Sequence, residues 1–185
     1  IVVDSQAYMY STEDIRFVVD EARRAGLTVA AHVQTEKGAR AAIEAGVASI
    51  EHGGVLGDDL LALAKQNRVT LVSTDFTVDA LVASGMERDT ATRTHQRRVT
   101  RLKRAWDAGV NVVFGTDVMS DVTGKTRGQA AMAFIDSFTE AGISAIDILR
   151  AMTSRAVELL GVASERGALR VGLAADIVAT PVNQL

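Results

Sequence analysis

Short runs of apolar, β-branched residues alternate with segments of helical periodicity along most of the chain. The runs predict strands at 28–32, 47–52, 69–74 and 110–117, and residues 1–3 are expected to be the end of a strand whose start is absent. Between them the pattern predicts helices, one opening at Ser11 and closing at Gly26, and others at 36–46, 58–67 and 90–108. Residues 75–90 are expected to be irregular. Two further helices follow, separated at Gly142.

Strands separated by single helices predict an α/β fold with a parallel sheet and right-handed crossovers. Both a doubly wound sheet and a (β/α)₈ barrel satisfy this pattern. Four successive strands end in polar residues, His32, His52, Thr74 and Asp117. In a barrel these ends converge on one mouth, whereas an open sheet would spread them along an edge. We therefore expect a TIM-type barrel.

A complete barrel needs roughly 250 residues, so a chain of 185 residues with a tail supplies about half of one. We expect residues 1–162 to be the C-terminal half of the barrel, and the missing strands to come from upstream sequence or another chain. The Gly-punctuated tail is expected to form two short strands within 166–181. Residues 163–185 would then belong to a flanking β-sandwich.

The composition limits the class of protein and the kinds of metal ligand that the chain can provide. The chain is 48% hydrophobic with a formal net charge of −3, which is typical of a soluble globular protein and argues against a nucleic-acid surface. It has no Cys, so any metal must be held by His and carboxylate. The first residues, I-V-V-D-S-Q, lack a basic segment followed by an apolar one, so no signal peptide is expected. No stretch approaches the about 20 continuous apolar residues of a membrane span, so no membrane association is expected and cytoplasm is the default location.

Three residues at strand ends form a candidate metal site: His32, His52 and Asp117. Imidazole and carboxylate suit Zn²⁺, Mn²⁺ or Fe²⁺, and a bound divalent ion activates water and polarises a carbonyl. Asp117 would also accept a proton from that water. Taken singly, each histidine is also compatible with a hydrogen-bonded core position, and Asp117 with a cap. Their occurrence together in successive strand–helix units favours the metal site.

Other polar residues have weaker assignments. Tyr8, Tyr10 and Thr74 are candidates for substrate contact. Glu51 precedes His52 and should point to the opposite face of its strand, where it would orient a neighbour or pair with a helix. His95 lies in a polar helix and is expected to be exposed without a role. The basic stripe of that helix is expected to be a solvated face, formed by Arg93, Arg97, Arg98, Arg101 and Arg104.

The segments V-A-A-H-V, A-G-V-A-S-I-E-H-G and V-V-F-G-T-D resemble the strand 5, 6 and 8 motifs of the amidohydrolase superfamily. The most similar branch is that of imidazolonepropionase-like and Xaa-Pro dipeptidase-like enzymes. Residues 140–161 resemble its final barrel helices, and 166–181 its exit into a small β-sandwich. The resemblance covers nearly the whole chain.

The resemblance implies a hydrolase that cleaves a C–N bond in a small molecule, such as a dipeptide or cyclic amide, with one or two divalent ions, expected to be Zn²⁺. It implies that His32 and His52 bind the more exposed metal, and that Asp117 binds the buried metal and shuttles a proton. The family pattern also has an H-x-H pair on strand 1 and often a carboxylated Lys on strand 4. This chain has no H-x-H, and its first Lys is Lys37, past strand 5.

Two alternatives from other classes stay open. The chain could be a non-catalytic half-barrel that associates with a missing segment or dimerises through its open edges, since exposed strand edges favour association. A homo-oligomer is expected in either case. An open α/β fold that binds a nucleotide ranks last, because neither G-x-G-x-x-G nor G-x-x-x-x-G-K-[ST] occurs in the sequence.

Overall fold

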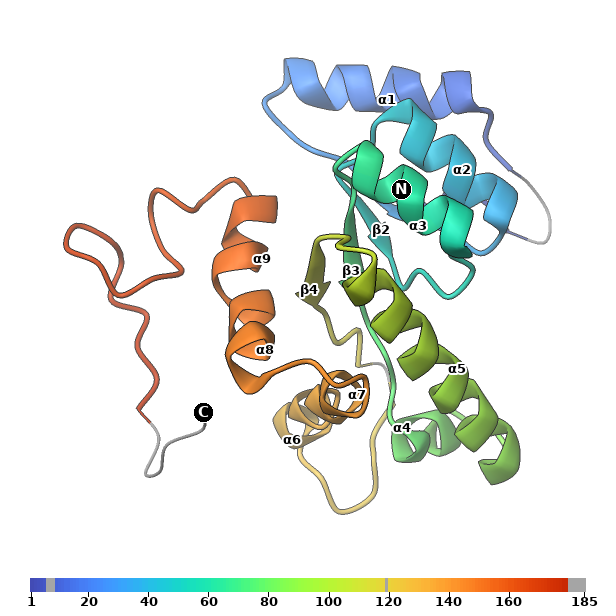
Figure 1. The fold of residues 1–185 in the computed structure, drawn as a ribbon, viewed down its shortest axis with the longest axis vertical. Helices are drawn as coiled ribbons and strands as arrows, with labels where there is room; N and C mark the ends of the chain where they lie inside the picture. The colour runs from blue at the N-terminus through green and yellow to red at the C-terminus, as the bar shows by residue number, and fades with distance from the viewer. Residues whose placement is uncertain (6–8, 119, 180–185) are drawn as a thin grey trace.

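The structure, a computed structural model, describes residues 1–5, 9–118 and 120–179. It is an α/β fold with a parallel sheet whose strands lie in their sequence order, β1-β2-β3-β4 (Figure 1). The strands are β1 (Ala30–His32), β2 (Ser49–Glu51), β3 (Thr70–Ser73) and β4 (Val112–Phe114). A doubly wound sheet reverses its strand order at a switch point, and the described strands contain no such reversal. Each predicted strand is present, although shorter than its apolar run.

Helices connect the strands and continue after them. Those between the strands are α1 (Thr12–Arg24), α2 (Glu36–Ala45), α3 (Asp58–Gln66), α4 (Val78–Ala83) and α5 (Arg88–Asp107). Those after β4 are α6 (Arg127–Met132), α7 (Ile135–Glu140), α8 (Ala145–Met152) and α9 (Ser154–Leu159). The segment predicted to be irregular thus contains α4, and the two expected final helices are four shorter ones. None of the described helices is both long and apolar enough to cross a bilayer.

The helix starts follow from local capping chemistry. Ser11 accepts a hydrogen bond from the Asp14 backbone N–H, and the Asp14 carboxylate accepts one from the Ser11 backbone N–H, which completes a capping box for α1. Thr35 caps α2 by accepting from the Gly38 N–H. These hydrogen bonds satisfy backbone donors that have no partner inside the helix. The prediction that α1 opens at Ser11 is confirmed.

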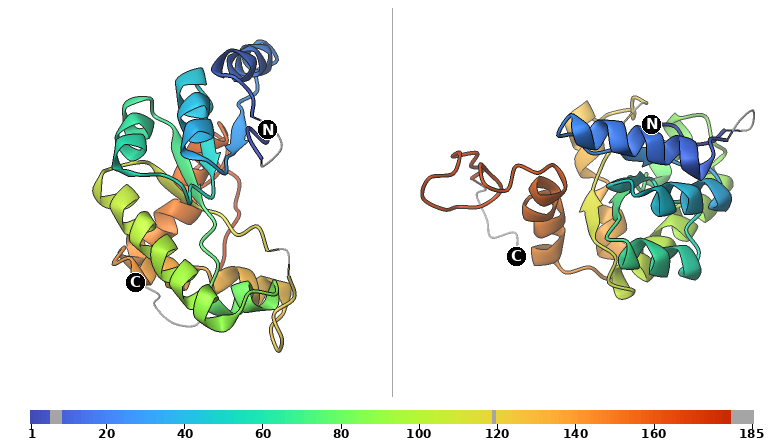
Figure 2. Two further views of the ribbon diagram at one scale, coloured as in Figure 1. Left: turned by 90° about the vertical axis from the view of Figure 1, so that its right-hand side faces the viewer. Right: turned by 90° about the horizontal axis from the view of Figure 1, so that it is seen from above.

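The helices divide into three groups around the sheet (Figures 1 and 2). Helices α1, α2 and α3 lie side by side on one flank, and α8 and α9 pack against β4 on the other. Helices α4, α6 and α7 gather beyond the carboxyl ends of the strands, where α5 extends to meet them. The buried core includes Ile50, Leu71, Leu102 and Phe138, which are at most 1% exposed. The carboxyl ends of the strands therefore face a helical layer.

The first residues of the chain extend the sheet past β1. The Val3 N–H donates to the His32 carbonyl at 2.9 Å, and the His32 N–H donates to the Ile1 carbonyl at 2.9 Å, which gives a parallel bridge between Val2 and His32. Asp4 ends this segment, is buried, and accepts hydrogen bonds from the Gln34 and Thr35 backbone N–H groups at 2.7 and 3.0 Å. The expected strand end at 1–3 is thus present beside β1.

Gly38 allows Asp4 to approach the start of α2. A Cβ at Gly38 would overlap the Asp4 carboxylate and lie 2.6 Å from its Cγ. Gly38→Ala is therefore expected to lower the free energy of unfolding by about 1–3 kcal/mol, although Ala favours helix by about 1 kcal/mol. Urea unfolding would measure this. In the control Gly54→Ala the added Cβ meets no atom within 4 Å, and equal losses in the two variants would contradict the steric explanation.

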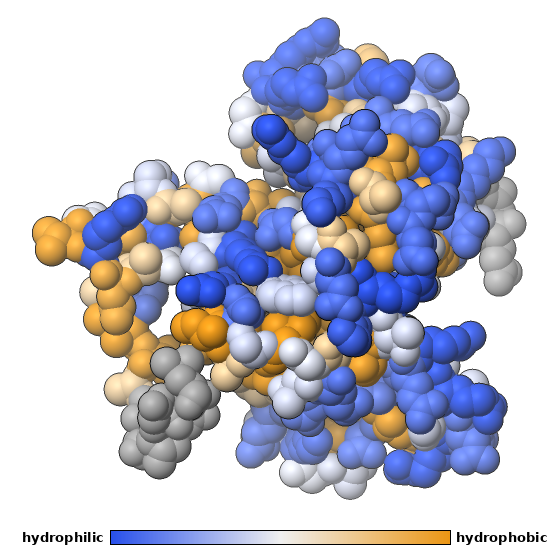
Figure 3. Space-filling model, in the orientation of Figure 1, coloured by the Kyte–Doolittle hydropathy of each residue, from blue (hydrophilic) through white to orange (hydrophobic). Residues whose placement is uncertain are grey.

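The tail does not form the two strands expected within 166–181. Residues 163–179 contain only turns and irregular backbone. The apolar side chains of this segment are largely exposed, as Figure 3 shows at its left edge; they include Leu169, Val171, Ile177 and Val178 at 84, 102, 63 and 88%. A strand needs a neighbouring strand to satisfy its backbone groups, and no described strand lies beside the tail. The prediction of sandwich strands is therefore not met in the described residues.

Candidate metal centre

The carboxyl ends of the four strands bring the predicted residues together. His32 ends β1, while His52, Thr74 and Asp117 lie one to three residues beyond β2, β3 and β4. The rings of His32 and His52 meet edge to face with centroids 4.7 Å apart. His52 Nε2 lies 3.9 Å from Asp117 Oδ2. Three donors that are far apart in sequence thus form one polar cluster.

Two of these residues have an unusual backbone conformation. His52 and Asp117 have φ angles of +65° and +48°, in the left-handed region that non-glycine residues seldom adopt. Each follows a strand and turns the chain sharply at the point where its side chain enters the cluster. Backbone conformations of this kind gather at functional sites, because a site can require a side-chain position that a relaxed turn would not provide. Arg68, which lies after α3 and outside the cluster, has the same conformation with a φ of +57°, so the backbone geometry agrees with a functional role for His52 and Asp117 but does not by itself identify them.

Thr74 orients the ring of His52. Its Oγ1 lies 2.5 Å from His52 Nδ1, so with the proton on Nδ1 the ring donates to Thr74 and its Nε2 lone pair faces Asp117. Burial lowers the pKa of His52 and the neighbouring His32 lowers it further, while Asp117 opposes both. The neutral imidazole, which is the form that binds a metal, is therefore favoured near neutral pH. Thr74 contacts a candidate ligand, a role that the strand pattern did not indicate.

Glu51 also lies near the cluster. In the ladder it pairs with His32, and its carboxylate accepts a hydrogen bond from Ser49 Oγ at 2.7 Å. Burial raises its pKa, the Ser49 hydrogen bond lowers it, and the charges of His32 and Asp117 act on it in opposite directions. Its contact is thus with its own strand, and it contributes a half-buried carboxylate next to the two histidines.

The side chains of His32, His52 and Asp117 carry donor atoms that suit a divalent ion. The distance between two of these atoms is longer than one bound ion requires. Two ligands of one tetrahedral zinc ion, each bound at about 2.0–2.2 Å, lie roughly 3.3–3.5 Å apart, compared with 3.9 Å for His52 Nε2 and Asp117 Oδ2. Among the described residues no three His, Asp or Glu side chains are arranged to hold a metal ion. His32 Nε2 instead lies 3.3 Å from Gln34 Nε2. The ligand set therefore remains a prediction supported by chemistry and proximity.

Of the two candidate tyrosines, only Tyr10 is among the described residues, and it lies at a hollow next to α1. Tyr8 lies outside the described residues. Tyr10 is 44% exposed and lines a hollow with Ile1, Asp14 and Phe17, next to α1. Their role in substrate contact stays a prediction.

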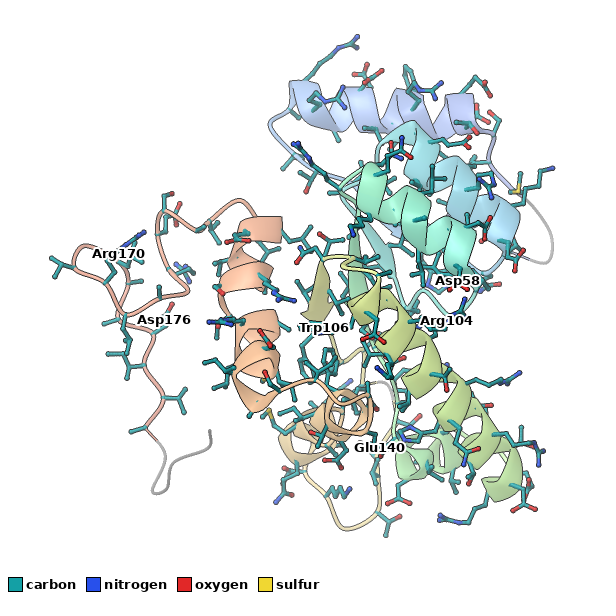
Figure 4. All side chains as sticks on the ribbon, viewed as in Figure 1. Asp58, Arg104, Trp106, Glu140, Arg170 and Asp176 are labelled. Carbon is teal, nitrogen blue, oxygen red and sulfur yellow. The ribbon has the colours of Figure 1, made fainter. Side chains whose placement is uncertain are left out.

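His95 is buried, not exposed. It is 6% exposed, and its Nδ1 and Nε2 lie 3.0 Å from the Phe76 carbonyl and 2.9 Å from Glu140 Oε2. The expectation of a solvated histidine was wrong because α5 packs against α7, from which Glu140 projects (Figure 4). Helical spacing from Ala91 through His95 to Leu102 is the sequence signal that could have placed it on the buried face.

The arginine stripe is also not a uniform solvated face. Arg101 is 5% exposed; it forms an ion pair with the buried Asp75 and donates to Ser73 Oγ at 3.2 Å. Ser137 Oγ donates to the Asp75 carbonyl at 2.8 Å, which connects α7 to the same group. By contrast, Arg104 pairs with Asp58 at the surface between α5 and α3 (Figure 4). Sequence reasoning missed this buried pair because Arg101 repeats the spacing of its exposed neighbours.

Comparisons with known proteins identify relatives of this chain. Ochratoxinase of Aspergillus niger is 28% identical over 183 residues, which cover 95% of this chain and 37% of that protein. Its crystal structure superposes with a TM-score of 0.77 at 27% identity, over 95% of this chain and 40% of that one. The chain therefore spans about two fifths of the length of this relative.

Two further solved structures give the same picture. One is described as an amidohydrolase and has a TM-score of 0.79 at 28% identity, covering 95% of this chain and 43% of that chain. The other is a prolidase complexed with N-methylphosphonate-L-proline, with a TM-score of 0.71 at 29% identity, covering 91% and 41%. The sequence profile of the amidohydrolase family matches residues 2–184. The chain belongs to the amidohydrolase family.

Proposed function

We propose that the protein containing this chain is a metal-dependent hydrolase that cleaves an amide C–N bond of a small molecule. The observation that carries the proposal is the meeting of His32, His52 and Asp117 at the carboxyl ends of parallel strands, with His52 Nε2 3.9 Å from Asp117 Oδ2. Family membership supports the reaction class. The left-handed backbone at His52 and Asp117 supports their role in it.

We further propose that residues 1–162 are half of a (β/α)₈ barrel. A barrel requires parallel strands in sequence order, and β1 to β4 have that order with the segment 1–3 paired beside β1. Active sites of such barrels lie at the carboxyl ends of the strands, which is where the polar cluster is found. The flanking β-sandwich for 163–185 remains part of the proposal.

In this proposal His32, His52 and Asp117 hold the ion. When bound, a divalent ion, expected to be Zn²⁺, supplies a water of lowered pKa and polarises the scissile carbonyl. Thr74 keeps the His52 ring in the orientation that directs Nε2 into the site. Asp117 accepts a proton from the attacking water and returns it to the departing nitrogen, so that a C–O bond replaces the C–N bond.

The relatives suggest which substrates to test. One is described as an ochratoxinase, and another as a prolidase complexed with N-methylphosphonate-L-proline. We therefore propose a dipeptide or a related small amide as the substrate. The non-catalytic alternative is a half-barrel that only associates with another segment or with a second copy. It is less favoured because the relatives that match this chain in sequence and fold are named for hydrolysis.

Metal content per polypeptide, measured by elemental analysis on the full-length protein, tests the ligand set. The His32→Ala/His52→Ala variant is expected to lose at least one equivalent of divalent metal, because it removes two imidazole donors. As a control, Asp107→Asn changes an exposed side chain that pairs with Lys103 on α5, and it should retain the wild-type content. Equal metal in wild type and the double variant, or absence of metal-dependent hydrolysis across a dipeptide and lactam panel, would refute the proposal.

A further inference from the structure

A cavity of about 210 Å³ lies in the helical layer beyond the carboxyl ends of the strands. Its walls come from α4, α6 and the segment after β4, and they are mostly apolar; they include Phe76, Leu81, Met86, Val118, Ala130 and Phe134. Arg98 of α5 is the one ionised side chain among its described lining residues. The cavity therefore combines a largely apolar interior with a single positive charge.

Arg98 lacks an acceptor for part of its guanidinium group. Its Nη1 is buried and, within the part of the chain that the structure describes, has no hydrogen-bond partner. Its Cζ lies 5.0 Å from the centroid of the Phe76 ring, a contact that leaves the N–H groups without an anion. Burial lowers the pKa of Arg98, Asp75 raises it, and Arg101 and Arg97 lower it further. A buried donor of this kind is costly unless an acceptor is supplied.

The charges around Arg98 do not balance. Asp75 is the carboxylate that acts on it, but Asp75 already forms an ion pair with the buried Arg101. Two guanidinium groups therefore share one carboxylate, which leaves an excess of one positive charge beside the cavity. Partly buried charges are normally paired, so this excess points to an anion that enters from outside the protein.

The cavity lies next to the candidate metal centre. Val118, which follows Asp117 directly, and Phe76, two residues after Thr74, both line it. A ligand group in the cavity is therefore near the proposed site of C–N cleavage.

We propose that this cavity is the substrate pocket for a carboxylate carried on an apolar group of about the size of one amino-acid residue, with Arg98 as the residue that binds the carboxylate. This inference rests on the proposed function, because it places the substrate relative to the metal centre. The excess of one charge matches a monoanionic carboxylate better than a phosphate dianion, and the apolar walls match an aliphatic or aromatic side chain. A neutral cyclic amide carries no negative charge to balance that of Arg98.

The pocket can be tested without hydrolysis, on the full-length protein from which metal has been removed by chelation. Calorimetric titration would compare N-acetyl-L-leucine with its neutral amide, N-acetyl-L-leucinamide. The acid is expected to bind about 10- to 100-fold more tightly, as a charge-assisted hydrogen bond implies. In Arg98→Met this preference should vanish, and in Arg98→Lys part of it should remain, because Lys keeps the charge but loses the planar fork.

Arg93→Met serves as the control. Arg93 is exposed on the same helix and lines a different hollow, between α5 and residues 54–57, so the acid preference should be unchanged. Equal binding of acid and amide by the wild type, binding of neither, or an unchanged preference in Arg98→Met would overturn the inference. If Arg98→Met fails to fold by circular dichroism, the wild-type comparison and Arg98→Lys decide.

Measurements of hydrolysis rates distinguish a failure of this inference from a failure of the proposed function. On an N-acyl-leucine substrate, Arg98→Met is expected to raise KM by about tenfold or more with a smaller change in kcat, because uniform binding is lost. Acid-selective binding without any metal-dependent hydrolysis would refute the hydrolase proposal and keep the pocket. Hydrolysis that treats acid and amide substrates alike would refute the pocket and keep the hydrolase.

Discussion

Asp117→Asn is expected to reduce kcat/KM of the full-length protein for its amide substrate by about 10³-fold or more. The amide side chain cannot accept the proton of the attacking water, and it is a weaker ligand than a carboxylate. Asn adopts the left-handed backbone at least as readily as Asp, so the φ of +48° at this position adds no strain. Steady-state kinetics with metal in excess, together with elemental analysis, would measure the two effects.

Asp121→Asn is the matched control for this change. Asp121 is exposed in the same segment after β4 and has no proposed role, so its replacement should leave kcat/KM within about twofold. Activity of Asp117→Asn within tenfold of the wild type would exclude Asp117 as the proton acceptor. The hydrolase proposal would then need another base, and Glu51 is the neighbouring half-buried carboxylate.

Arg101→Met is expected to lower the free energy of unfolding by about 3 kcal/mol, near the lower end of the range for breaking a buried ion pair. The variant leaves the carboxylate of Asp75, which is 1% exposed, without its guanidinium partner. The loss is not larger because the charge of Arg98 still acts on Asp75 and the Ser73 hydroxyl still donates to it. Urea unfolding monitored by circular dichroism would measure the change.

The surface pair of the same helix provides the comparison. Arg104→Met removes an ion pair with Asp58, in which the side chains of Arg104 and Asp58 are 42% and 84% exposed. It should lower the free energy of unfolding by less than about 1 kcal/mol. The two variants make the same replacement on one helix and differ mainly in burial. Similar losses for both would show that the Arg101–Asp75 pair does not hold the helical layer to the sheet.

The elements of the sheet were predictable because their signals are local. β-branched runs ended by polar residues marked all four strands, and Ser11 marked the start of α1 through a hydrogen bond within four residues. The strands are shorter than their runs because a strand ends where its neighbour ends, and a single run contains no information on its partner. The tail shows the same limit: its sequence is typical of strands, but strands need partners that the described residues do not provide.

The candidate site was predictable in part. His32, His52 and Asp117 stand out because parallel strands bring their carboxyl ends to one edge, so sequence position alone indicates that they meet. The contact of Thr74 with His52, the burial of His95 and the different surroundings of Arg98, Arg101 and Arg104 were not indicated. These arginines follow one another on one helix at similar spacing, so the sequence does not tell which of them is buried. Only the elements packed against each arginine decide that.

The sequence by itself determined the four strands, the helices α1, α2, α3 and α5, the cap of α1 at Ser11 and the three strand-end residues that are candidates for metal binding. Each of these depends on residues near one another in the chain or on the general geometry of parallel sheets. The tertiary structure alone decided which polar side chains are buried. The pairing of Arg101 with Asp75 and the cavity beside Arg98 arise where α4, α5, α6 and α7 pack beyond the sheet. Burial changes the energy of a charge more than its residue type does, and burial is a property of the packed molecule.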